Sequence, residues 1–214
     1  AISINAFAHP EHAEDDDIKN RVEQSFDLRD FNKIAVVGVY NMDVDVGTPG
    51  YSIHTSGDEK DMSEMNVYVK NGTLYLATDE DNKRRGWKKK DNRGIDITIT
   101  LPSLVGLEVT GVGSGEVNGI NSEEFDVEIA GIGALELSGR CGRLDADYAG
   151  MGELDAKDLK CEDVSVDMSG MGAATVYASE SVDADMSGMG SIDIYGSPKK
   201  VKKNKGFMSS IDIH

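Results

Sequence analysis

Apolar and polar residues alternate with a period of two along most of the chain beyond residue 106. At 135–137 and at 192–194, for example, two apolar residues enclose one acidic residue. Such alternation is typical of a β-strand that buries one of its two faces. Similar alternating stretches precede each of these units, at 125–129, 144–148, 164–168 and 182–186. The pattern therefore predicts a series of short strands with one apolar face and one acidic face.

Two glycines separated by one residue lie between the strands of each unit, and the unit repeats. The copies begin at Gly111, Gly131, Gly150, Gly170, Gly188 and Phe207, and their starts lie 20, 19, 20, 18 and 19 residues apart. A period in this range is typical of a solenoid. Two short strands cannot close a core alone, but stacked copies would bury each apolar side chain between neighbours at about 4.8 Å. The sequence therefore predicts an all-β fold, a flattened parallel β-helix with rungs of two strands.

The corner glycines are expected to be structural, because a sharp corner needs a positive φ or a close approach of two chain segments. They are Gly111, Gly113, Gly131, Gly133, Gly150, Gly152, Gly170, Gly172, Gly188 and Gly190. We expect the residue between each pair of glycines to point inward. These residues, Val112, Ile132, Met151, Met171 and Met189, would then form a buried apolar column. A methionine-lined column could bind a ligand or metal, but unbranched methionine is ordinary filling for a tight space, and we favour that interpretation.

Residues 1–25 lack strand periodicity. Residues 1–8 are mostly apolar and end in Ala6-Phe7-Ala8, the small-x-small pattern that precedes a signal-peptidase cleavage site. Residues 9–25 are rich in acidic side chains and are expected to form a flexible leader. We interpret the segment as the remnant of a secretion signal with a leader behind it, and we therefore expect export.

Alternation resumes near Phe26, and residues 26–105 are expected to cap the repeats of residues 106–214 within a single domain, 26–214. Asn71-Gly72 lies between two alternating runs, which is the strongest short-range signal of a β-hairpin. A cap is expected because the first rung would otherwise present an open sheet edge.

A basic segment around the only tryptophan interrupts this N-terminal β region. Its cationic and aromatic residues are Lys83, Arg84, Arg85, Trp87, Lys88, Lys89, Lys90 and Arg93. One interpretation is a loop that binds an anionic partner, such as an acidic glycan, through charge and through stacking on the tryptophan. The other is a solvated loop whose charge aids solubility. We favour the second, because no phosphate-binding glycine pattern accompanies the basic residues.

Five lysines precede the last copy of the repeat, which lacks both corner glycines. They are Lys199, Lys200, Lys202, Lys203 and Lys205. Charged and atypical terminal repeats stop solenoids from stacking further. We therefore interpret these lysines first as edge protection and second as a binding patch.

Cys141 and Cys161 each lie nine residues before the first glycine of the next corner, Gly150 and Gly170. The stack would place the two cysteines at equivalent positions of adjacent rungs, with Cα atoms about 4.8 Å apart. That distance allows a disulfide, and export would favour oxidation. Two stacked free thiols are the alternative, because parallel Cα–Cβ bonds would strain the bridge.

Composition and charge exclude several classes of function. The formal net charge of −17 argues against nucleic acid or an anionic bilayer as the partner of the body of the protein. No run of 18 apolar residues is present, so no transmembrane segment is expected. The four histidines are scattered, and neither a catalytic triad nor a P-loop nor a zinc-binding spacing is present, so we expect no metal and no cofactor.

Several stretches together resemble one bacterial family. They are FDLRDFNKIAVVGVYNMDVDVG, NGTLYL, ITITLPSLVGLEVTGVGSGEV and the tandem Gly-x-Gly units, and they extend over about residues 26–214. The combination resembles the head GIN domain family, which is described as auto-transporter adhesins. The resemblance implies a β-helical fold similar to that of pectin lyases and a role in adhesion. It also implies export to the periplasm or the cell surface of a Gram-negative bacterium. It implies no catalytic or binding residues, and the basic segment is not part of it.

Two alternatives concern the repeat itself. Calcium-binding β-rolls need an aspartate two residues after the last glycine, where this chain has Ile192 after Gly190, and Asp193 comes one place late. Enzymes of the pectin-lyase fold cleave acidic polysaccharides with grouped carboxylates, but the acidic residues here form regular ladders that solubility alone explains. We therefore expect a non-enzymatic interaction module with an unidentified envelope or surface ligand.

Overall fold

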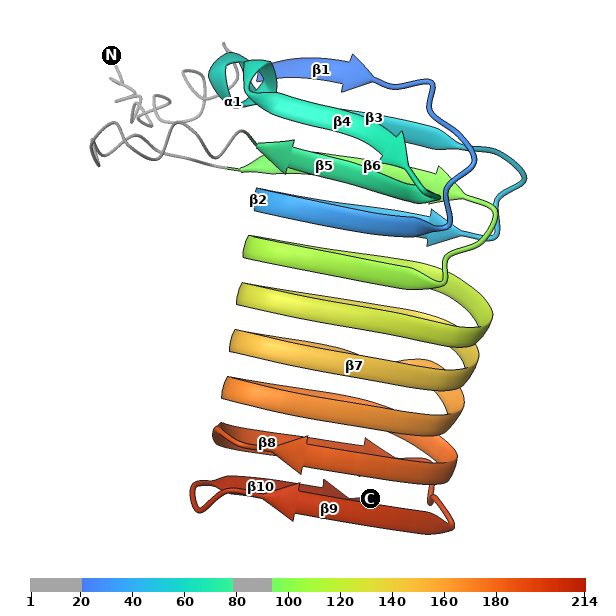
Figure 1. The fold of residues 1–214 in the computed structure, drawn as a ribbon, viewed down its shortest axis with the longest axis vertical. Coiled ribbons are helices and arrows are strands. Elements are labelled where there is room, and N and C mark those ends of the chain that lie inside the picture. The colour runs from blue at the N-terminus through green and yellow to red at the C-terminus, as the bar shows by residue number, and fades with distance from the viewer. Residues whose placement is uncertain (1–20, 79–93) are drawn as a thin grey trace, which may run out of the picture.

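The computed structural model describes residues 21–78 and 94–214, which form an all-β fold with one short helix (Figure 1). The elements are β1 (Arg21–Ser25), β2 (Lys33–Val46), β3 (Ser52–Asp58), α1 (Glu59–Ser63), β4 (Met65–Lys70), β5 (Thr73–Thr78), β6 (Ile95–Leu101), β7 (Gly106–Met186), β8 (Met189–Tyr195), β9 (Lys200–Lys205) and β10 (Ser209–Ile213). The prediction of an all-β fold is confirmed. The predictions for residues 1–20 and for the basic segment, Lys83 to Arg93, lie outside the described residues.

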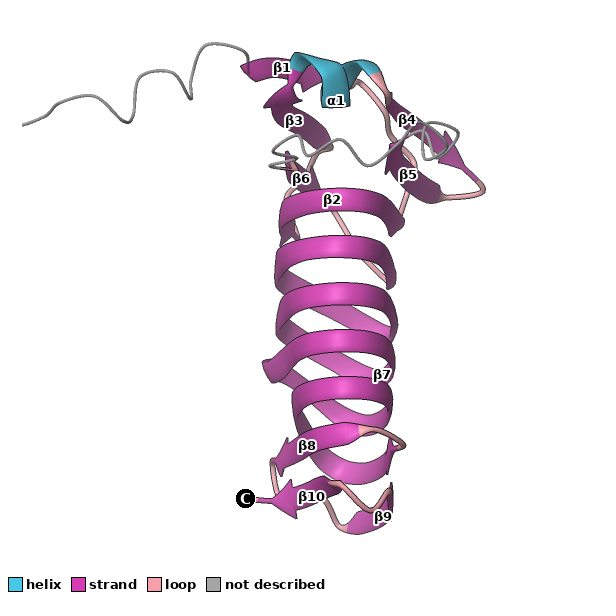
Figure 2. Cartoon of the chain, turned by 90° about the vertical axis from the view of Figure 1, so that its left-hand side faces the viewer, coloured by secondary structure: helices cyan, strands magenta, loops and turns pink. Residues whose placement is uncertain are grey.

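One strand is far longer than all the others. β7 runs for 81 residues, and Figure 2 shows that it coils so that its successive turns stack. β2 pairs with the start of β7, the end of β7 pairs with β8 and β9, and β8 pairs with β10, all in parallel. The pairs β1–β3, β3–β6 and β4–β5 are antiparallel. The sheet is therefore mixed rather than purely parallel.

The apolar residues of the alternating stretches lie in one core that follows the stack. Leu137 and Ile192 are buried, whereas Glu136, beside Leu137 in the chain, is exposed. Side chains of this core come from every part of the coil, among them Val44, Phe125, Leu144, Leu154, Val166, Ala174, Val182 and Ile194. The period of two thus separates a buried row from a solvated row on each side of the coil.

The residue between each pair of corner glycines points outward, so the expectation of a buried column is wrong. The five residues Val112, Ile132, Met151, Met171 and Met189 have exposed fractions between 41% and 49%. The physical reason is that the alternation continues through the corner. Gly131 and Gly133 lie an even number of residues from the buried Ile129 and Leu135, so they face inward. Ile132, between the two glycines, therefore faces outward.

The corner glycines are needed because successive turns approach each other closely. A Cβ atom built on any of the ten corner glycines would lie 1.7–2.0 Å from a backbone carbonyl oxygen of the preceding turn. For Gly133 that oxygen belongs to Gly113, and for Gly152 it belongs to Gly133. No side chain fits at the inward positions of these corners, and this accounts for the Gly-x-Gly pattern.

The N-terminal elements lie at one end of the stack (Figure 1). β4 and β5 form the predicted hairpin, with Asn71 and Gly72 at positive φ angles of 52° and 77° in the turn. β5 also pairs in parallel with β2, and β2 pairs in parallel with β7. β2 therefore belongs to the stack, although it lies in the segment that we expect to form the cap.

β1 falls within residues 9–25, for which we expect a flexible leader, so for Arg21–Ser25 that expectation is wrong. The strand pairs with β3 through five residues. Arg21 also donates hydrogen bonds to Ser56 and Asp96. Backbone pairing with a neighbouring strand explains why β1 forms without alternation of apolar residues.

The C-terminal lysines contact the acidic residues of the preceding turn. The Nζ atoms of Lys199 and Lys202 each lie 2.7 Å from a carboxylate oxygen, of Glu180 and Asp183 respectively. Lys203 lies on β9 opposite the buried Ala184, and its Nζ donates to the carbonyl oxygen of Ile211 at 3.1 Å. A charged residue at an inward position discourages a further strand from pairing, which supports the interpretation as edge protection.

A disulfide joins Cys141 and Cys161, whose Cα atoms lie 4.5 Å apart. It lies about halfway between successive corners along the chain, on the side of the coil away from the glycines. There it links two adjacent turns through side chains that are both buried.

Candidate functional site

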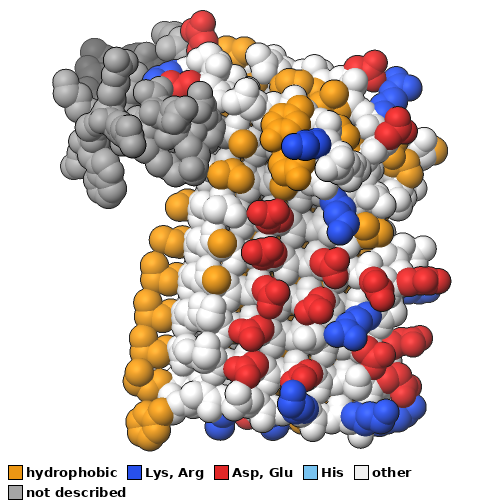
Figure 3. Space-filling model, in the orientation of Figure 1, with side chains coloured by type: hydrophobic (Ala, Val, Ile, Leu, Met, Phe, Trp, Pro, Cys, Tyr) orange, Lys and Arg blue, Asp and Glu red, His pale blue; other side chains and the backbone are white. Residues whose placement is uncertain are grey.

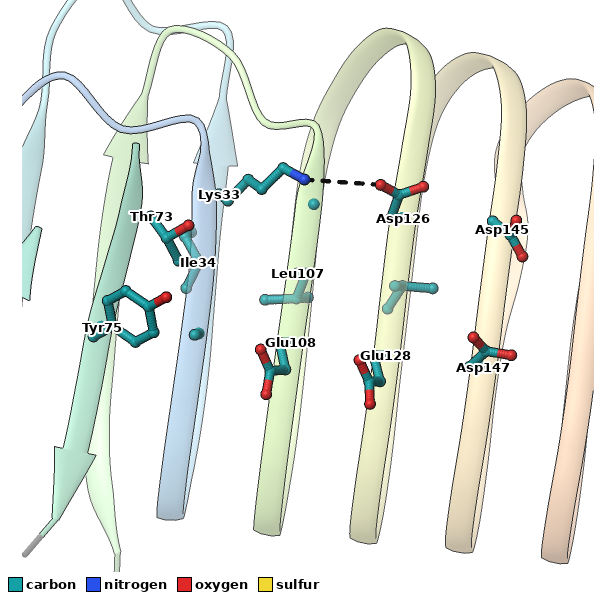
Figure 4. A pocket seen from close by; sticks show the side chains of 13 residues that line it. Lys33, Ile34, Thr73, Tyr75, Leu107, Glu108, Asp126, Glu128, Asp145 and Asp147 are labelled. Carbon is teal, nitrogen blue, oxygen red and sulfur yellow. Dashed lines mark ion pairs between the residues drawn. The ribbon is translucent and has the colours of Figure 1, made fainter. Parts of the chain in front are cut away.

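A groove of about 340 Å³ lies where the hairpin meets the coil (Figure 4). Its lining comes from β5, β2 and the first turns of β7. The lining residues are Lys33, Ile34, Ala35, Thr73, Tyr75, Gly106, Leu107, Glu108, Asp126, Val127, Glu128, Asp145 and Asp147. A volume of this size is within the range of small-ligand sites in proteins.

The groove results from small residues in the middle of a row of large ones. Cross-strand pairing aligns Tyr68 with Tyr75, Tyr75 with Ala35, and Ala35 with Glu108. In the adjacent row, Lys33 pairs with Gly106. The surface is therefore hollowed at Ala35 and Gly106, because these small residues lie between the tyrosines on one side and the carboxylates on the other.

Two tyrosines form the aromatic side of the site. The rings of Tyr68 and Tyr75 have centroids 5.1 Å apart and are inclined by 15°, which is a stacked arrangement. Tyr68 is 46% exposed, and Tyr75 lies at the groove. The alternation in MNVYVKNGTLYLAT already places the two tyrosines opposite each other across the turn, so the hairpin sequence alone contains a signal for this pair.

Carboxylates form the other side of the groove, in a row that continues beyond it. Glu108, Glu128 and Asp147 line the groove from successive turns of β7. Asp167 and Asp185 stand at the corresponding places further along, each four residues before its corner residue. Burial, and then the carboxylates of Asp185 and Asp147, raise the pKa of the Asp167 carboxyl above its usual range. The row therefore carries a concentrated negative charge.

Lys33 is a cation at the edge of this acidic surface. Its Nζ lies 3.9 Å from a carboxylate oxygen of Asp126, as the dashed line in Figure 4 shows. Both side chains are about half exposed or more. The pair is solvated and holds Lys33 only weakly, so Lys33 remains available to a ligand.

A second groove, of about 330 Å³, lies on the other side of the coil, between β6, β2 and β7. Asn41 and Asp96 line it, and the Asn41 side-chain amide donates to the Asp96 carboxylate at 3.0 Å. Asp43 and Glu116 line it as well. Burial, followed by the charges of Asp45 and Glu116, raises the pKa of the Asp43 carboxyl. This groove has no aromatic side chain in its lining.

These arrangements can accept hydrogen bonds and attract cations. Within residues 21–78 and 94–214, no group of three or more His, Cys, Asp or Glu side chains is arranged to hold a metal ion. In the same part of the chain, no helix is long and apolar enough to cross a membrane. The expected binding residues of the basic segment cannot be placed relative to either groove, because that segment lies outside the described residues.

Comparison with known proteins shows what the chain is similar to. Residues 30–198 match the model of a family described as "Putative auto-transporter adhesin, head GIN domain". The crystal structure of a putative adhesin from Bacteroides fragilis has 28% sequence identity and a TM-score of 0.71, over 92% of this chain and 98% of that one. No curated protein sequence matches significantly.

Two more distant structures share the fold. A putative lipid binding protein from Parabacteroides distasonis is 16% identical with a TM-score of 0.54, over 91% of this chain and 98% of that one. A putative adhesin from Parabacteroides merdae is 13% identical with a TM-score of 0.53, over 91% and 97% of the two chains. The family match covers well over half of the sequence, so the chain belongs to the head GIN domain family of putative auto-transporter adhesins.

Proposed function

We propose that the protein is a non-catalytic interaction module of the bacterial cell envelope, exported to the periplasm or the cell surface, where it binds a glycan. Membership of the adhesin family and the adhesin description of the Bacteroides fragilis protein support a role in surface interaction. The stacked turns of β7 are interpreted as a β-solenoid, whose repeated outward rows offer a long binding surface.

The observation that carries the proposal is the groove between Tyr75 and the carboxylates of Glu108, Glu128 and Asp147. The apolar C–H face of a sugar ring can pack on a tyrosine ring, and sugar hydroxyls can donate to carboxylate oxygens. The acidic row repels anionic sugars. At this groove, a neutral glycan or one that carries amino groups is therefore favoured over an acidic glycan.

The basic segment remains a separate prediction. Charge reversal at Arg84, Arg85, Lys88 and Lys89 should abolish any salt-sensitive binding to acidic glycans or lipopolysaccharide without lowering the melting temperature. Unchanged binding after the reversal would leave the segment as a solvated connector. The groove and the basic segment thus predict ligands of opposite charge.

A glycan array with the folded protein tests the groove. We expect neutral or amino-bearing glycans to bind, and Tyr75→Ala to weaken the best of them about tenfold, the loss expected when one stacking contact is removed. Glu128→Gln should weaken an amino-bearing ligand more than a neutral one, because only the former loses an ion pair. Tyr177→Ala removes a tyrosine far from the groove and serves as the matched control.

The outcome also separates binding from catalysis. Mass spectrometry of the bound glycan after long incubation should show its original length. A shortened glycan would instead favour the alternative of a polysaccharide-active enzyme. Retention of the ligand by the Tyr75→Ala and Glu128→Gln proteins with unchanged affinity would exclude the groove as the site.

A further inference from the structure

An exposed apolar ridge runs along the Gly-x-Gly edge of the coil. Its six members, one from each of six successive corners, are Val112, Ile132, Met151, Met171, Met189 and Met208. Five are 41–49% exposed and Met208 is 62% exposed, with Phe207 fully exposed beside it. Figure 3 shows this line of hydrophobic side chains projecting along one long edge of the molecule. Side chains this exposed contribute little to the core, so the fold itself does not require them to be apolar.

The ridge lies in a band that is almost free of charge. Two residues before each ridge residue of β7 and β8, the outward side chains are Thr110, Ala130, Ala149, Ser169 and Ser187. Two residues after the same ridge residues they are Ser114, Ala134, Glu153, Ala173 and Ser191. Glu153 is the one charged side chain among these ten.

Acidic rows border the band on both sides. Glu128 stands four residues before Ile132 and Glu136 four residues after it, and neighbouring turns repeat this arrangement. Four residues of strand correspond to about 13 Å. The acidic side chains therefore lie back from the edge, outside direct contact with anything that touches only the ridge.

The shape of the ridge decides between possible partners. At about 4.8 Å per turn the ridge is about 24 Å long, and with its flanking small residues it is only about 13 Å wide. Such a strip covers roughly 300 Å², well below the roughly 800 Å² per partner of a stable protein interface. If two copies met ridge to ridge, their convex surfaces would bury an even smaller area. A fluid apolar phase, in contrast, adapts to a narrow convex edge.

We propose that the ridge docks the protein edge-on to a zwitterionic lipid bilayer, with the long axis of the coil parallel to the membrane surface. The Val, Ile and Met side chains enter the boundary between headgroups and acyl chains, where a row of apolar side chains gains the most from leaving water. The acidic rows stay in the aqueous layer. Because they carry negative charge on both sides of the ridge, they select against anionic lipids.

Flotation with phosphatidylcholine vesicles measures this directly. The wild-type protein should float with the vesicles, and Ile132→Ser with Met151→Ser and Met171→Ser should lower the partition coefficient at least tenfold. The control variant, Val201→Ser with Ile213→Ser, removes two similarly exposed apolar side chains away from the ridge and should bind within twofold of the wild type. Circular dichroism should show that both variants are folded, since all five residues are exposed.

Lipid charge provides a second readout with a defined sign. Replacing about 30% of the phosphatidylcholine by phosphatidylglycerol should weaken binding at low salt, and the difference should shrink as NaCl rises to about 0.3 M. Equal binding of the ridge variant and the wild type would overturn the proposal, as would stronger binding to the anionic vesicles that persists after charge reversal at Arg84, Arg85, Lys88 and Lys89. A dimer that the ridge substitutions dissociate, without vesicle binding, would instead identify a second copy as the partner.

Discussion

The two edges of the coil are built on different principles. At the Gly-x-Gly edge, the five corners between residues 111 and 190 have glycine at both inward positions, and successive turns meet backbone to backbone. The residue between the two glycines of each corner is apolar and exposed. On the opposite side, different side chains fill the interior, namely Ile120, Cys141, Leu159, Cys161 and Ala178. Charges of both signs lie outside them, such as Arg143 beside Asp145 and Lys160 beside Asp158.

The comparison distinguishes positions at which the fold requires one residue type from positions at which it allows many. The close approach of successive turns demands glycine at the inward corner positions, but it places no demand on the outward residue. The opposite side shows that outward residues can be charged. An uninterrupted apolar column at the glycine edge therefore points to a role outside the fold, and the following substitutions test each part of this difference.

Placing a charge in the interior should have the largest effect. Leu137→Asp buries a carboxylate between turns and should lower the free energy of unfolding by at least about 4 kcal/mol. Glu136→Gln, one residue earlier on the outward face, should change it by less than about 0.5 kcal/mol. Urea midpoints for the two variants check this order, and the reverse order would refute the strand register.

A methyl group at the glycine edge should come next. In Gly133→Ala the new Cβ would meet the Gly113 carbonyl oxygen at 1.7 Å unless the turns separate. We expect a loss of about 3 to 4 kcal/mol, in the range of strained backbone substitutions. Gly50→Ala is the control, because its Cβ meets nothing within 4 Å. Similar midpoints for the two alanine variants would show that the turns are not closely packed at this corner.

Loss of the disulfide tests the opposite side. Replacing Cys141 and Cys161 together by alanine opens a loop with a sequence separation of 20. On the chain-entropy model this should cost about 3 kcal/mol. Adding a reductant to the wild type should lower the urea midpoint to the same value. A midpoint that does not respond to reductant, together with two alkylatable thiols in the unreduced protein, would mean that the bridge is absent in solution.

Removing one carboxylate from the acidic row should have the smallest effect. The raised pKa of Asp167 means that the folded state binds its proton more tightly than the unfolded chain does. Its unfavourable contribution is therefore present at neutral pH and disappears as the pH falls through the range in which the carboxyl is protonated. Asp167→Asn should stabilise by about 0.3 kcal/mol at pH 7 and low salt, because the side chain is exposed and screened.

Thermal melts of the wild type and the Asp167→Asn protein at several pH values check the sign. The difference in melting temperature should vanish in acid and shrink in high salt, because salt screens the neighbouring carboxylates but does not change the burial of the side chain. A variant that is less stable than the wild type at pH 7 would show that the row is stabilised by contacts other than charge repulsion.

The alternation in the sequence was sufficient to predict the buried rows, because Leu137 or Ile192 can face the core only at one parity. The same rule, carried through the glycines, also places Ile132 and Met171 outside. The expectation of a buried column is wrong because it assumes that a new alternation starts at each corner, whereas the alternation continues through the two glycines. Glycine has no side chain to show which way it faces, so the direction has to be counted from the flanking Ile129 and Leu135, and the close contact with the preceding turn agrees with that count.

The candidate site could be predicted only in part. The turn at Asn71-Gly72 pairs Tyr68 with Tyr75, and the acidic positions of β7 repeat visibly. The groove itself depends on the parallel pairing of β5 with β2, which places Ala35 and Gly106 between these two groups. Pairing between strands that are distant in sequence leaves no local signal. The sequence of β2 also hides that this strand is part of the stack, because Tyr40 stands where later turns have the second corner glycine.

Methionine oxidation distinguishes outward-facing from inward-facing positions most directly, because this chain has methionines at positions of both kinds. Met151, Met171, Met189 and Met208 lie on the ridge, whereas Met42, Met62, Met168 and Met186 are at most 4% exposed. After a short treatment of the folded protein with hydrogen peroxide, peptide mass spectrometry should find sulfoxide at the four ridge methionines. The four buried ones should react at least about tenfold more slowly. Protection of Met151, Met171 and Met189 equal to that of Met168 and Met186 would show that the corner residues point inward and would contradict the exposed ridge.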